Sequence, residues 1–269
     1  MEKIKLRKAY SSLYKNELRL QLKSICWWFG VLAVLVLINI VIYPLVDSLM
    51  SSLTAEERAE LGEYGAVFDY SSITAYFLAE CVQTHIVGGA LFACCFATIA
   101  VARDFKRGTY ELLYTNALSR RQVLATKYSA LVTVILMLNI FLLVIELLGM
   151  AIIQFKGIDI VPILAFALFG IIVQLIVASI VFGITICNPK KFGLGVGIGL
   201  PLILYFVSAI SVALNGSAKW VENLSPFTIF NGFKVGAPFD LNYLALGIFA
   251  ALAVVVIVLG FRRNQNIDY

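Results

Sequence analysis

Long uninterrupted runs of apolar residues constrain this sequence more than any other feature. The chain contains six such runs, which span residues 25–46, 73–102, 128–153, 160–187, 193–214 and 242–261. Each run is long enough for one helical crossing of a bilayer, which requires roughly 20 residues. Hydrophobic residues make up 61% of the 269 positions and charged residues 14%, whereas soluble domains are about a quarter charged. The sequence therefore predicts an all-α membrane protein with six transmembrane helices and no large soluble domain.

Residues 1–24 precede the first run and mix basic with apolar side chains. Leu6, Tyr10 and Leu13 follow helical spacing, which leaves the lysines to other faces. This pattern indicates an amphipathic helix lying in the membrane interface. A regulatory role of this helix and a role as an anchor that only orients the first crossing are both open. We thus divide the chain into an interfacial helix at 1–24 and a six-helix transmembrane domain at 25–269.

The distribution of basic residues predicts the orientation of the chain. One side of the predicted membrane holds 17 of the 21 lysine and arginine residues, mostly within 1–24 and 103–127. The loops of the other side are 47–72 and 215–241, and the first of these is acidic. Because cationic loops stay on the cytoplasmic side, we expect a multi-pass protein of the cell membrane with both termini in the cytoplasm. The basic residues that give the chain its net charge of +5 are then expected to contact the headgroups of the lipid bilayer rather than nucleic acid.

The stretch 103–127, between the second and third runs, carries the most specific motif. It reads RDFKRGTYELL at 103–113 and NALSRRQ at 116–122. This string resembles the first cytoplasmic loop of type-2 ABC exporter permeases, which typically show an acidic and a basic residue, GT-x-E-x-L, a small-residue turn and SR. The LSPF string at 224–227 and the basic ending at 262–263 are similar to the same family.

The resemblance implies that 103–127 is a coupling helix that docks in a groove of an ATP-binding-cassette ATPase subunit. It also implies a second copy of the chain, or a paralogous permease, as partner. The coupling residues would be Arg103, Lys106, Arg107, Thr109, Glu111, Ser119, Arg120 and Arg121. The sequence contains no G-x-x-x-x-G-K-[ST] phosphate loop, so ATP and Mg²⁺ are expected in the partner, with no cofactor or catalytic residue in this chain.

The residues of this stretch support the same interpretation without the family. Thr109 is suited to cap a short helix, and Asn116 or Ser119 is suited to cap a second one that carries two arginines. The alternative is a solvated basic loop that obeys the positive-inside rule. A loop with that single role has no need of the Gly108-Thr109 turn chemistry, so we favour docking.

Several polar residues interrupt the apolar runs, where they are costly and often functional. They are Glu80, His85, Asn139, Glu146 and Gln174. We treat all five as candidates for a translocation path. Hydrogen bonding between helices is the preferred interpretation of Asn139 and Gln174, whereas for Glu146 a proton site and a structural role both stay open. His85 has no second histidine or carboxylate at ligand spacing, so no metal site is predicted.

The fifth run begins with alternating glycines, Gly193, Gly195, Gly197 and Gly199. These form two overlapping G-x-x-x-G pairs, a pattern that lets two membrane helices approach closely. Helix packing is therefore their predicted role, and a hinge with Pro201 is the alternative.

These features predict the transmembrane subunit of an ABC exporter for a hydrophobic or amphipathic substrate, such as a peptide, drug or lipid. A secondary transporter or channel that needs no ATPase is the alternative, and it would show inverted repeats and a buried charge cluster. The sequence shows no convincing repeat and a single well-buried acidic residue, Glu146. An intramembrane protease would need a buried Ser/His or paired Asp constellation, and the one histidine disfavours it.

Overall fold

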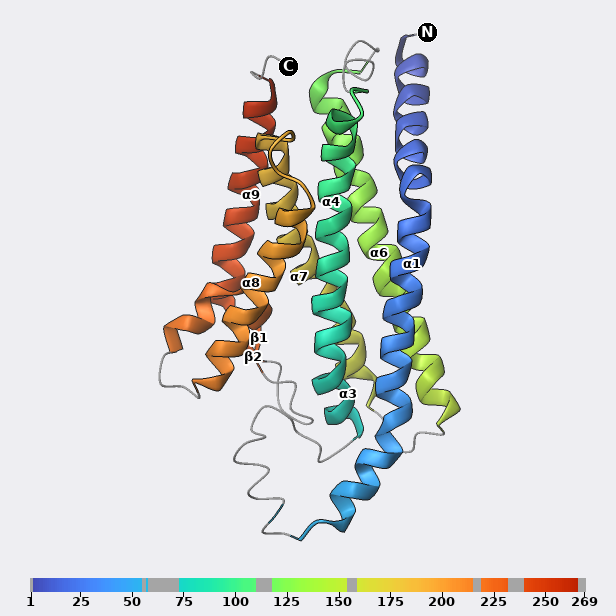
Figure 1. The fold of residues 1–269 in the computed structure, drawn as a ribbon, viewed down its shortest axis with the longest axis vertical. Coiled ribbons are helices and arrows are strands. Elements are labelled where there is room, and N and C mark those ends of the chain that lie inside the picture. The colour runs from blue at the N-terminus through green and yellow to red at the C-terminus, as the bar shows by residue number, and fades with distance from the viewer. Residues whose placement is uncertain are drawn as a thin grey trace.

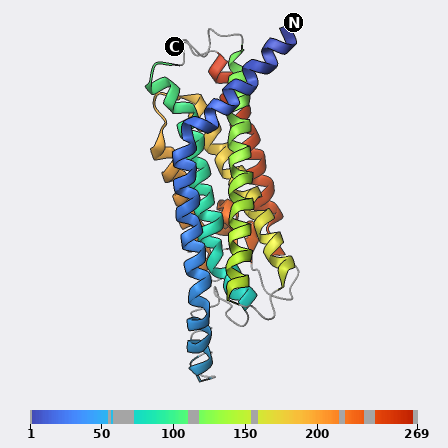
Figure 2. The same ribbon diagram turned by 90° about the vertical axis from the view of Figure 1, so that its right-hand side faces the viewer.

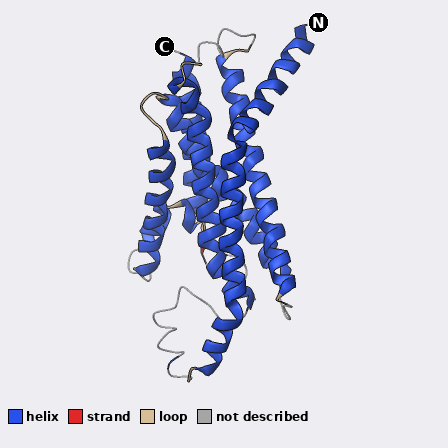
Figure 3. Ribbon diagram, turned by 45° about the vertical axis from the view of Figure 1, so that its right-hand side comes forward, coloured by secondary structure: helices blue, strands red, loops and turns tan. Residues whose placement is uncertain are grey.

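The protein is an all-α bundle in which six helices are long and apolar enough to cross a membrane. The computed structural model describes residues 2–54, 57, 73–109, 118–153, 159–214, 219–231 and 240–265. Figure 3 shows how completely helices dominate these residues. The predicted fold class is thereby confirmed.

The helices follow the apolar runs closely. The principal elements are α1 (Glu2–Ser52), α3 (Ile73–Cys81), η1 (Val82–Gly88), α4 (Gly89–Lys106), α6 (Arg120–Ile152), α7 (Ile160–Cys187), α8 (Leu194–Ala213) and α9 (Tyr243–Gln265). The predicted fourth crossing and α7 have the same bounds. The second crossing is compound, because α3, the π-helical turn η1 and α4 follow one another without a break.

The first element differs from the sequence division at residue 24. The structure joins the expected interfacial helix and the first crossing into one helix, α1, because the residues around Ser24 include no glycine or proline that would end a helix. The N-terminal part of α1 leans away from the bundle axis in Figure 2. The far end of α1 changes direction and extends below the other helices in Figure 1, as expected for a helix that contains a proline, here Pro44.

Both termini lie at the same end of the bundle, which we call the loop end (Figure 1). The end of α4 and the start of α6 also lie there. Short elements cover part of the opposite end, namely η2 (Lys219–Leu224), η3 (Pro226–Thr228) and the two-residue strands β1 (Phe230–Asn231) and β2 (Asp240–Leu241). The strands pair antiparallel, with Phe230 opposite Leu241. An even number of crossings accounts for the shared position of the termini.

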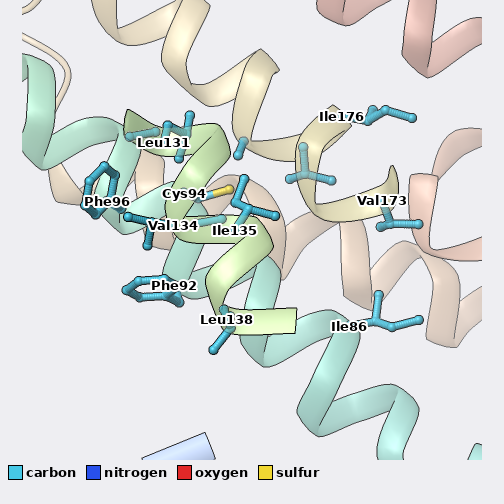
Figure 4. Close-up of a cluster of buried hydrophobic side chains, with 14 of the residues drawn as sticks. Ile86, Phe92, Cys94, Phe96, Leu131, Val134, Ile135, Leu138, Val173 and Ile176 are labelled. Atoms are coloured by element: carbon cyan, nitrogen blue, oxygen red, sulfur yellow. The ribbon is translucent and has the colours of Figure 1, made fainter. Parts of the chain in front are cut away.

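The helix α4 is the centre of the bundle. In the most apolar stretch of the span Thr84–Lys106, which consists mainly of α4, 83% of the residues are buried, against 22% in the spans of α8 and α9. Phe92, Cys94 and Phe96 of α4 lie beside Leu131 and Ile135 of α6 in the apolar core (Figure 4). The outer helices instead present large apolar side chains outward, which is the arrangement expected of a protein surrounded by lipid.

Glycines permit the closest helix contacts, but not all of those that the sequence suggested. A Cβ added to Gly197 would lie 2.7 Å from Thr98 Oγ1 of α4, so this position requires glycine. At Gly193 the nearest described atom would be Lys106 Nζ at 3.5 Å, and Gly195 and Gly199 have no described atom within 4 Å. The alternating glycines therefore point in opposite directions, and one face of α8 packs within the chain.

The closest approach of a glycine to the backbone of another helix joins α7 to α9, and no sequence pattern indicates it. A Cβ on Gly260 would lie 2.7 Å from the carbonyl oxygen of Gly183. A Cβ on Gly183 would in turn lie 2.8 Å from the backbone of Val256. The two glycines are far apart in sequence, so no G-x-x-x-G spacing within one helix marks them.

Candidate functional site

Buried polar residues gather at two places in the bundle. The first group is the membrane-core cluster, which consists of His85, Asn139, Glu146 and Gln174. The second group is the loop-end cluster, which consists of Glu17, Arg103, Asp104 and Lys127. The first joins η1, α6 and α7, and the second joins α1, α4 and α6. Both are therefore built by residues that are far apart in sequence.

The membrane-core cluster is a continuous chain of hydrogen bonds. His85 Nδ1 lies 2.6 Å from Glu146 Oε1, and His85 Nε2 lies 2.9 Å from Asn139 Oδ1. The Asn139 amide nitrogen donates to Gln174 Oε1 at 2.7 Å and to the carbonyl oxygen of Ile135 at 2.8 Å. The Gln174 amide nitrogen donates to the carbonyl oxygen of His85 at 3.0 Å.

Local structure explains how these residues meet. Asn139 and Glu146 are seven residues apart on α6 and so share one helical face. His85 lies in the π-helical turn η1, and such turns inside α-helices are frequent at functional sites. A Cβ on Gly89 would collide with the Gln174 amide, so glycine is needed where α4 passes α7.

The cluster is closed to its surroundings in this conformation. The exposed fraction is 0% for His85, Glu146 and Gln174 and 1% for Asn139. The ring of Phe166 packs edge-on against the His85 ring, with centroids 5.4 Å apart. The second carboxylate oxygen of Glu146 is buried and has no hydrogen-bond partner among the described residues. The four residues therefore form a sealed polar centre and do not line an open passage.

The fifth translocation-path candidate, Glu80, takes no part in this hydrogen-bond chain. It is half-buried on α3, five residues before His85. Next to His85, Thr84 accepts a hydrogen bond from the side chain of Asn39 at 3.4 Å. That contact connects η1 to α1.

The loop-end cluster is a network of buried ion pairs. Lys127 Nζ lies 2.6 Å from Glu17 Oε1 and 2.5 Å from Asp104 Oδ2, and it also donates to the carbonyl oxygen of Ala100 at 2.7 Å. Arg103 Nη2 lies 2.8 Å from Glu17 Oε2. The side chains are at most 10% exposed. Two carboxylates and two cations are thus paired where α4 ends and α6 begins.

The network also contains unsatisfied groups. Arg103 Nη1 and both amide atoms of Gln21 are buried without a hydrogen-bond partner in the described structure. Gln21 lies one turn beyond Glu17 on α1 and is 4% exposed. Unpaired buried polar groups cost free energy. A rearrangement that gave these atoms hydrogen-bond partners would therefore stabilise the bundle.

The predicted coupling residues have different environments. Lys106 and Arg107 are exposed at the end of α4. Gly108 follows with φ at 68°, a left-handed conformation that suits glycine at a helix end. The backbone nitrogen of Thr109 then donates to the Asp104 carbonyl oxygen at 3.0 Å. Glu111 lies outside the described residues.

Across the connection, Ser119 caps a helix as expected, but that helix is α6 itself. Ser119 and Gln122 form a reciprocal capping box, which satisfies two backbone donors. The Arg120 guanidinium donates to the carbonyl oxygens of Asn264 and Gln265, and Arg121 donates to the Gln265 side chain at 2.8 Å. These two arginines therefore hold the C-terminal end of α9.

Sequence reasoning missed three members of the loop-end cluster. Glu17 continues the helical spacing of the apolar face of residues 1–24, and this position was the available signal for a buried acid. Asp104 and Lys127 stand at the two ends of the polar stretch, which made them look solvated. No group of three or more potential metal ligands occurs in the described part of the chain.

Comparison with known proteins supplies one family match. The sequence model of the family described as "Multidrug efflux system permease Rv1217c, C-terminal domain" matches residues 17–263. A comparison with curated proteins finds no similar sequence. The matched region extends from Glu17 of the loop-end cluster to the last turn of α9, so both clusters lie within it.

Proposed function

The chain belongs to the family of the C-terminal domain of a multidrug efflux system permease, and we propose that it is the transmembrane subunit of an ATP-binding-cassette exporter. In this proposal separate ATPase subunits bind ATP and Mg²⁺ and push on the connection between α4 and α6. A second copy of the chain, or a paralogous permease, completes the translocation path, and both termini face the cytoplasm.

The loop-end cluster is the observation that supports this proposal. Asp104 stands at the end of α4 and Lys127 at the beginning of α6, so their ion pair clamps the two ends of the connection together. Glu17 binds Lys127 and Arg103, which attaches α1 to the same point. A force applied to the connection is therefore transmitted to three helices at once.

The energetics of buried charges make such a joint stiff. Removing one partner from a buried ion pair costs about 3–5 kcal/mol, because the other charge stays without compensation. The three helices consequently move as one body, or they exchange ion-pair partners in a concerted step. Arg120 adds α9 to the joint through the carbonyl oxygens of Asn264 and Gln265.

The surface offered to the ATPase is narrower than the motif alone implied. Lys106 and Arg107 are exposed, and the planar fork of arginine pairs well with carboxylates. Arg120 and Arg121 are occupied at the end of α9, so we assign them to positioning of the loop end. Docking then depends on Lys106, Arg107 and the adjacent connection.

The substrate we propose is a hydrophobic drug or an amphipathic peptide or lipid. The described spans offer large apolar side chains to the bilayer, and the polar centre is sealed. A substrate with much apolar surface can reach the interface between two such chains directly from the lipid. The family description names multidrug efflux, which agrees with the drug class.

The decisive experiment reverses the exposed charges. The chain is co-purified with the ATPase subunit that this proposal requires, and Lys106→Glu/Arg107→Glu is expected to abolish complex formation and substrate-stimulated ATP hydrolysis. The matched control is Lys190→Glu/Lys191→Glu, an equal charge reversal at exposed positions between α7 and α8. Intact assembly and coupled hydrolysis in the Lys106/Arg107 variant would disprove the docking role.

One observation favours the alternative of a secondary transporter. The buried His85–Glu146 pair is the kind of membrane-embedded ionisable site that such transporters use. The test is to reconstitute the chain alone in liposomes and to impose a proton gradient. Uphill drug transport without any ATPase would replace the exporter proposal with this one.

A further inference from the structure

The hydrogen bonds of the membrane-core cluster have directions that the backbone imposes. A carbonyl oxygen can only accept a hydrogen bond. The Asn139 amide nitrogen faces the carbonyl oxygen of Ile135, and the Gln174 amide nitrogen faces the carbonyl oxygen of His85. Reversing either amide would bring two oxygens together. Asn139 Oδ1 therefore acts as an acceptor toward His85.

This acceptor determines the protonation state of the imidazole. His85 Nε2 lies 2.9 Å from Asn139 Oδ1 and so carries a hydrogen. The other ring nitrogen, Nδ1, lies 2.6 Å from Glu146 Oε1. Two lone pairs at that distance would repel each other, so a second proton lies between Nδ1 and Oε1. The pair is then neutral overall, either as an imidazolium with a carboxylate or as an imidazole with a carboxylic acid.

In the packed site, either loss or gain of a proton by the His85–Glu146 pair is energetically unfavourable. Loss would leave a net negative charge that no described cation contacts, in a site with no solvent exposure. Gain would leave a net positive charge in the same surroundings. Uncompensated charges at membrane depth are costly, so the packed cluster holds one shared proton.

We propose that the membrane-core cluster is a proton-binding site, which holds one proton between His85 and Glu146 while the helices are packed and releases it when water reaches them. In water a carboxyl group is ionised throughout the neutral range, and an imidazole is half-protonated at about pH 6.5. The separated pair therefore retains about a quarter of a proton at about pH 7. Opening releases the remainder, about three quarters of a proton.

The release couples the conformation of the bundle to pH. The packed state binds more protons than the open state, so acid favours packing and alkali favours opening. Between about pH 6 and about pH 8 the equilibrium shifts toward the open state by about 25-fold. This goes beyond ATP-driven export, since it makes every movement that exposes the cluster sensitive to protons.

Among the described residues, no other charged side chain forms a hydrogen bond or ion pair with His85 or Glu146. The described hydrogen-bond and ring contacts of the pair are with Asn139, Gln174 and Phe166, and none of these is ionisable. The other helices carry ionisable side chains among the described residues, such as Glu80 on α3, Tyr43 on α1 and Cys94 on α4, and the pair hydrogen-bonds with none of these three. On α7 the span around Gln174 carries none. The proton count is therefore a property of His85 and Glu146.

The first test uses the fact that His85 is the only histidine of the chain. The full chain, purified without a histidine tag, is labelled on both ring nitrogens of histidine and studied by nuclear magnetic resonance in lipid nanodiscs. We expect a hydrogen on Nε2, a strong hydrogen bond at Nδ1 and the same spectrum at about pH 6 and about pH 8. An imidazole that titrates as it does in water would overturn the proposal, whatever the ATPase does.

The second test counts the proton by linkage. Glu146→Gln has nearly the same shape but cannot share the proton, so its folded state binds one proton fewer than the wild type. In uncharged detergent micelles the unfolding equilibrium constant of the wild type, divided by that of the variant, should rise about tenfold per pH unit. All other titrating groups cancel in this ratio.

The matched control for the linkage test is Glu57→Gln, which changes an exposed carboxyl group outside the candidate spans. Its ratio to the wild type should stay constant between about pH 6 and about pH 8. A ratio for Glu146→Gln that is equally flat would show that the pair holds no shared proton. Should that variant fail to fold, the wild-type resonance test decides alone.

Discussion

The two buried clusters both join helices through polar side chains, but they compensate the buried charges in different ways. The loop-end cluster pairs two carboxylates with two cations, whereas the membrane-core cluster has one ionisable pair held by two amides. The first lies where α4 ends and α6 begins, and Lys127 there also donates to a backbone carbonyl oxygen. The second lies between helices in an apolar surrounding, where a full charge costs more. Depth in the bundle therefore decides whether the chain joins its helices with charges or with a proton and dipoles.

Both clusters share α6, which suggests that this helix connects them. Lys127 lies near its start, and Asn139 and Glu146 lie further along. A movement of the loop end is thus communicated along one rigid helix to the polar centre. The following predictions test how far the two clusters differ, from the largest expected effect to the smallest.

The largest effect is expected from Lys127→Met, which keeps the length of the side chain and removes its charge. Glu17 and Asp104 would then share Arg103 as their remaining cation, so one buried negative charge would be uncompensated. The free energy of unfolding should therefore fall by about 3–5 kcal/mol. Chemical unfolding in micelles measures this. The control is Lys106→Met, which removes an exposed charge at the end of α4 and should change stability little. Equal losses in both variants would contradict the buried network.

A smaller effect is expected from Asn139→Leu in the membrane-core cluster. The substitution leaves the His85 Nε2 hydrogen and Gln174 Oε1 without their partner. Unsatisfied buried groups cost about 1–3 kcal/mol, and the same unfolding experiment measures the loss. A loss of stability as large as that of Lys127→Met would contradict the proposed difference between the two clusters, because neutral hydrogen bonds would then contribute as much as the buried ion pairs.

Arg103→Lys should have a still smaller effect. The lysine keeps the charge but loses the guanidinium fork, which reaches Glu17 and Asp104 from two nitrogens. We expect a loss of about 1 kcal/mol, because Lys127 still compensates both acids. A double-mutant cycle with Glu17→Gln measures the coupling between the two positions. A coupling energy of zero would show that Arg103 does not share in the network.

The smallest effect concerns an exposed pair, which serves as the reference for both clusters. The backbone nitrogen and hydroxyl of Thr54 donate to the Glu57 carboxylate, and these bonds lower the pKa of Glu57 below its usual value. Their stabilisation is present above the usual pKa and is lost as the pH falls through the lowered one. Resonance titration of Glu57 should show the lowered pKa, with no measurable change in global unfolding for Glu57→Gln. A pKa of Glu57 at its usual value would show that Thr54 does not hydrogen-bond to this carboxylate.

Several features of the fold were readable from single stretches of sequence. The apolar runs predicted all six spans, since the length of a crossing is set by the bilayer and by the rise of a helix. Ser119 was recognised as a cap because capping is a contact between residues three positions apart. Four of the five polar candidates in the spans proved to belong to one cluster, because polar residues are rare enough there to stand out.

Other features were not readable because they depend on pairs that the sequence separates. Glu17 and Lys127 are 110 positions apart, and no local pattern indicates that they meet. The contact of Arg120 with α9 was not readable for the same reason, since its acceptors are the last carbonyl oxygens of that helix. Gly260 is needed because the carbonyl oxygen of Gly183 lies beside it.

The sequence by itself determined that this chain is a bundle of membrane helices and where each helix lies. Those properties follow from the bilayer acting on each segment separately. The tertiary structure alone decided which polar groups are paired, in which direction their hydrogen bonds run and how many protons they hold. A buried polar group is satisfied by whichever partner the packing brings to it, and packing is a property of the whole bundle.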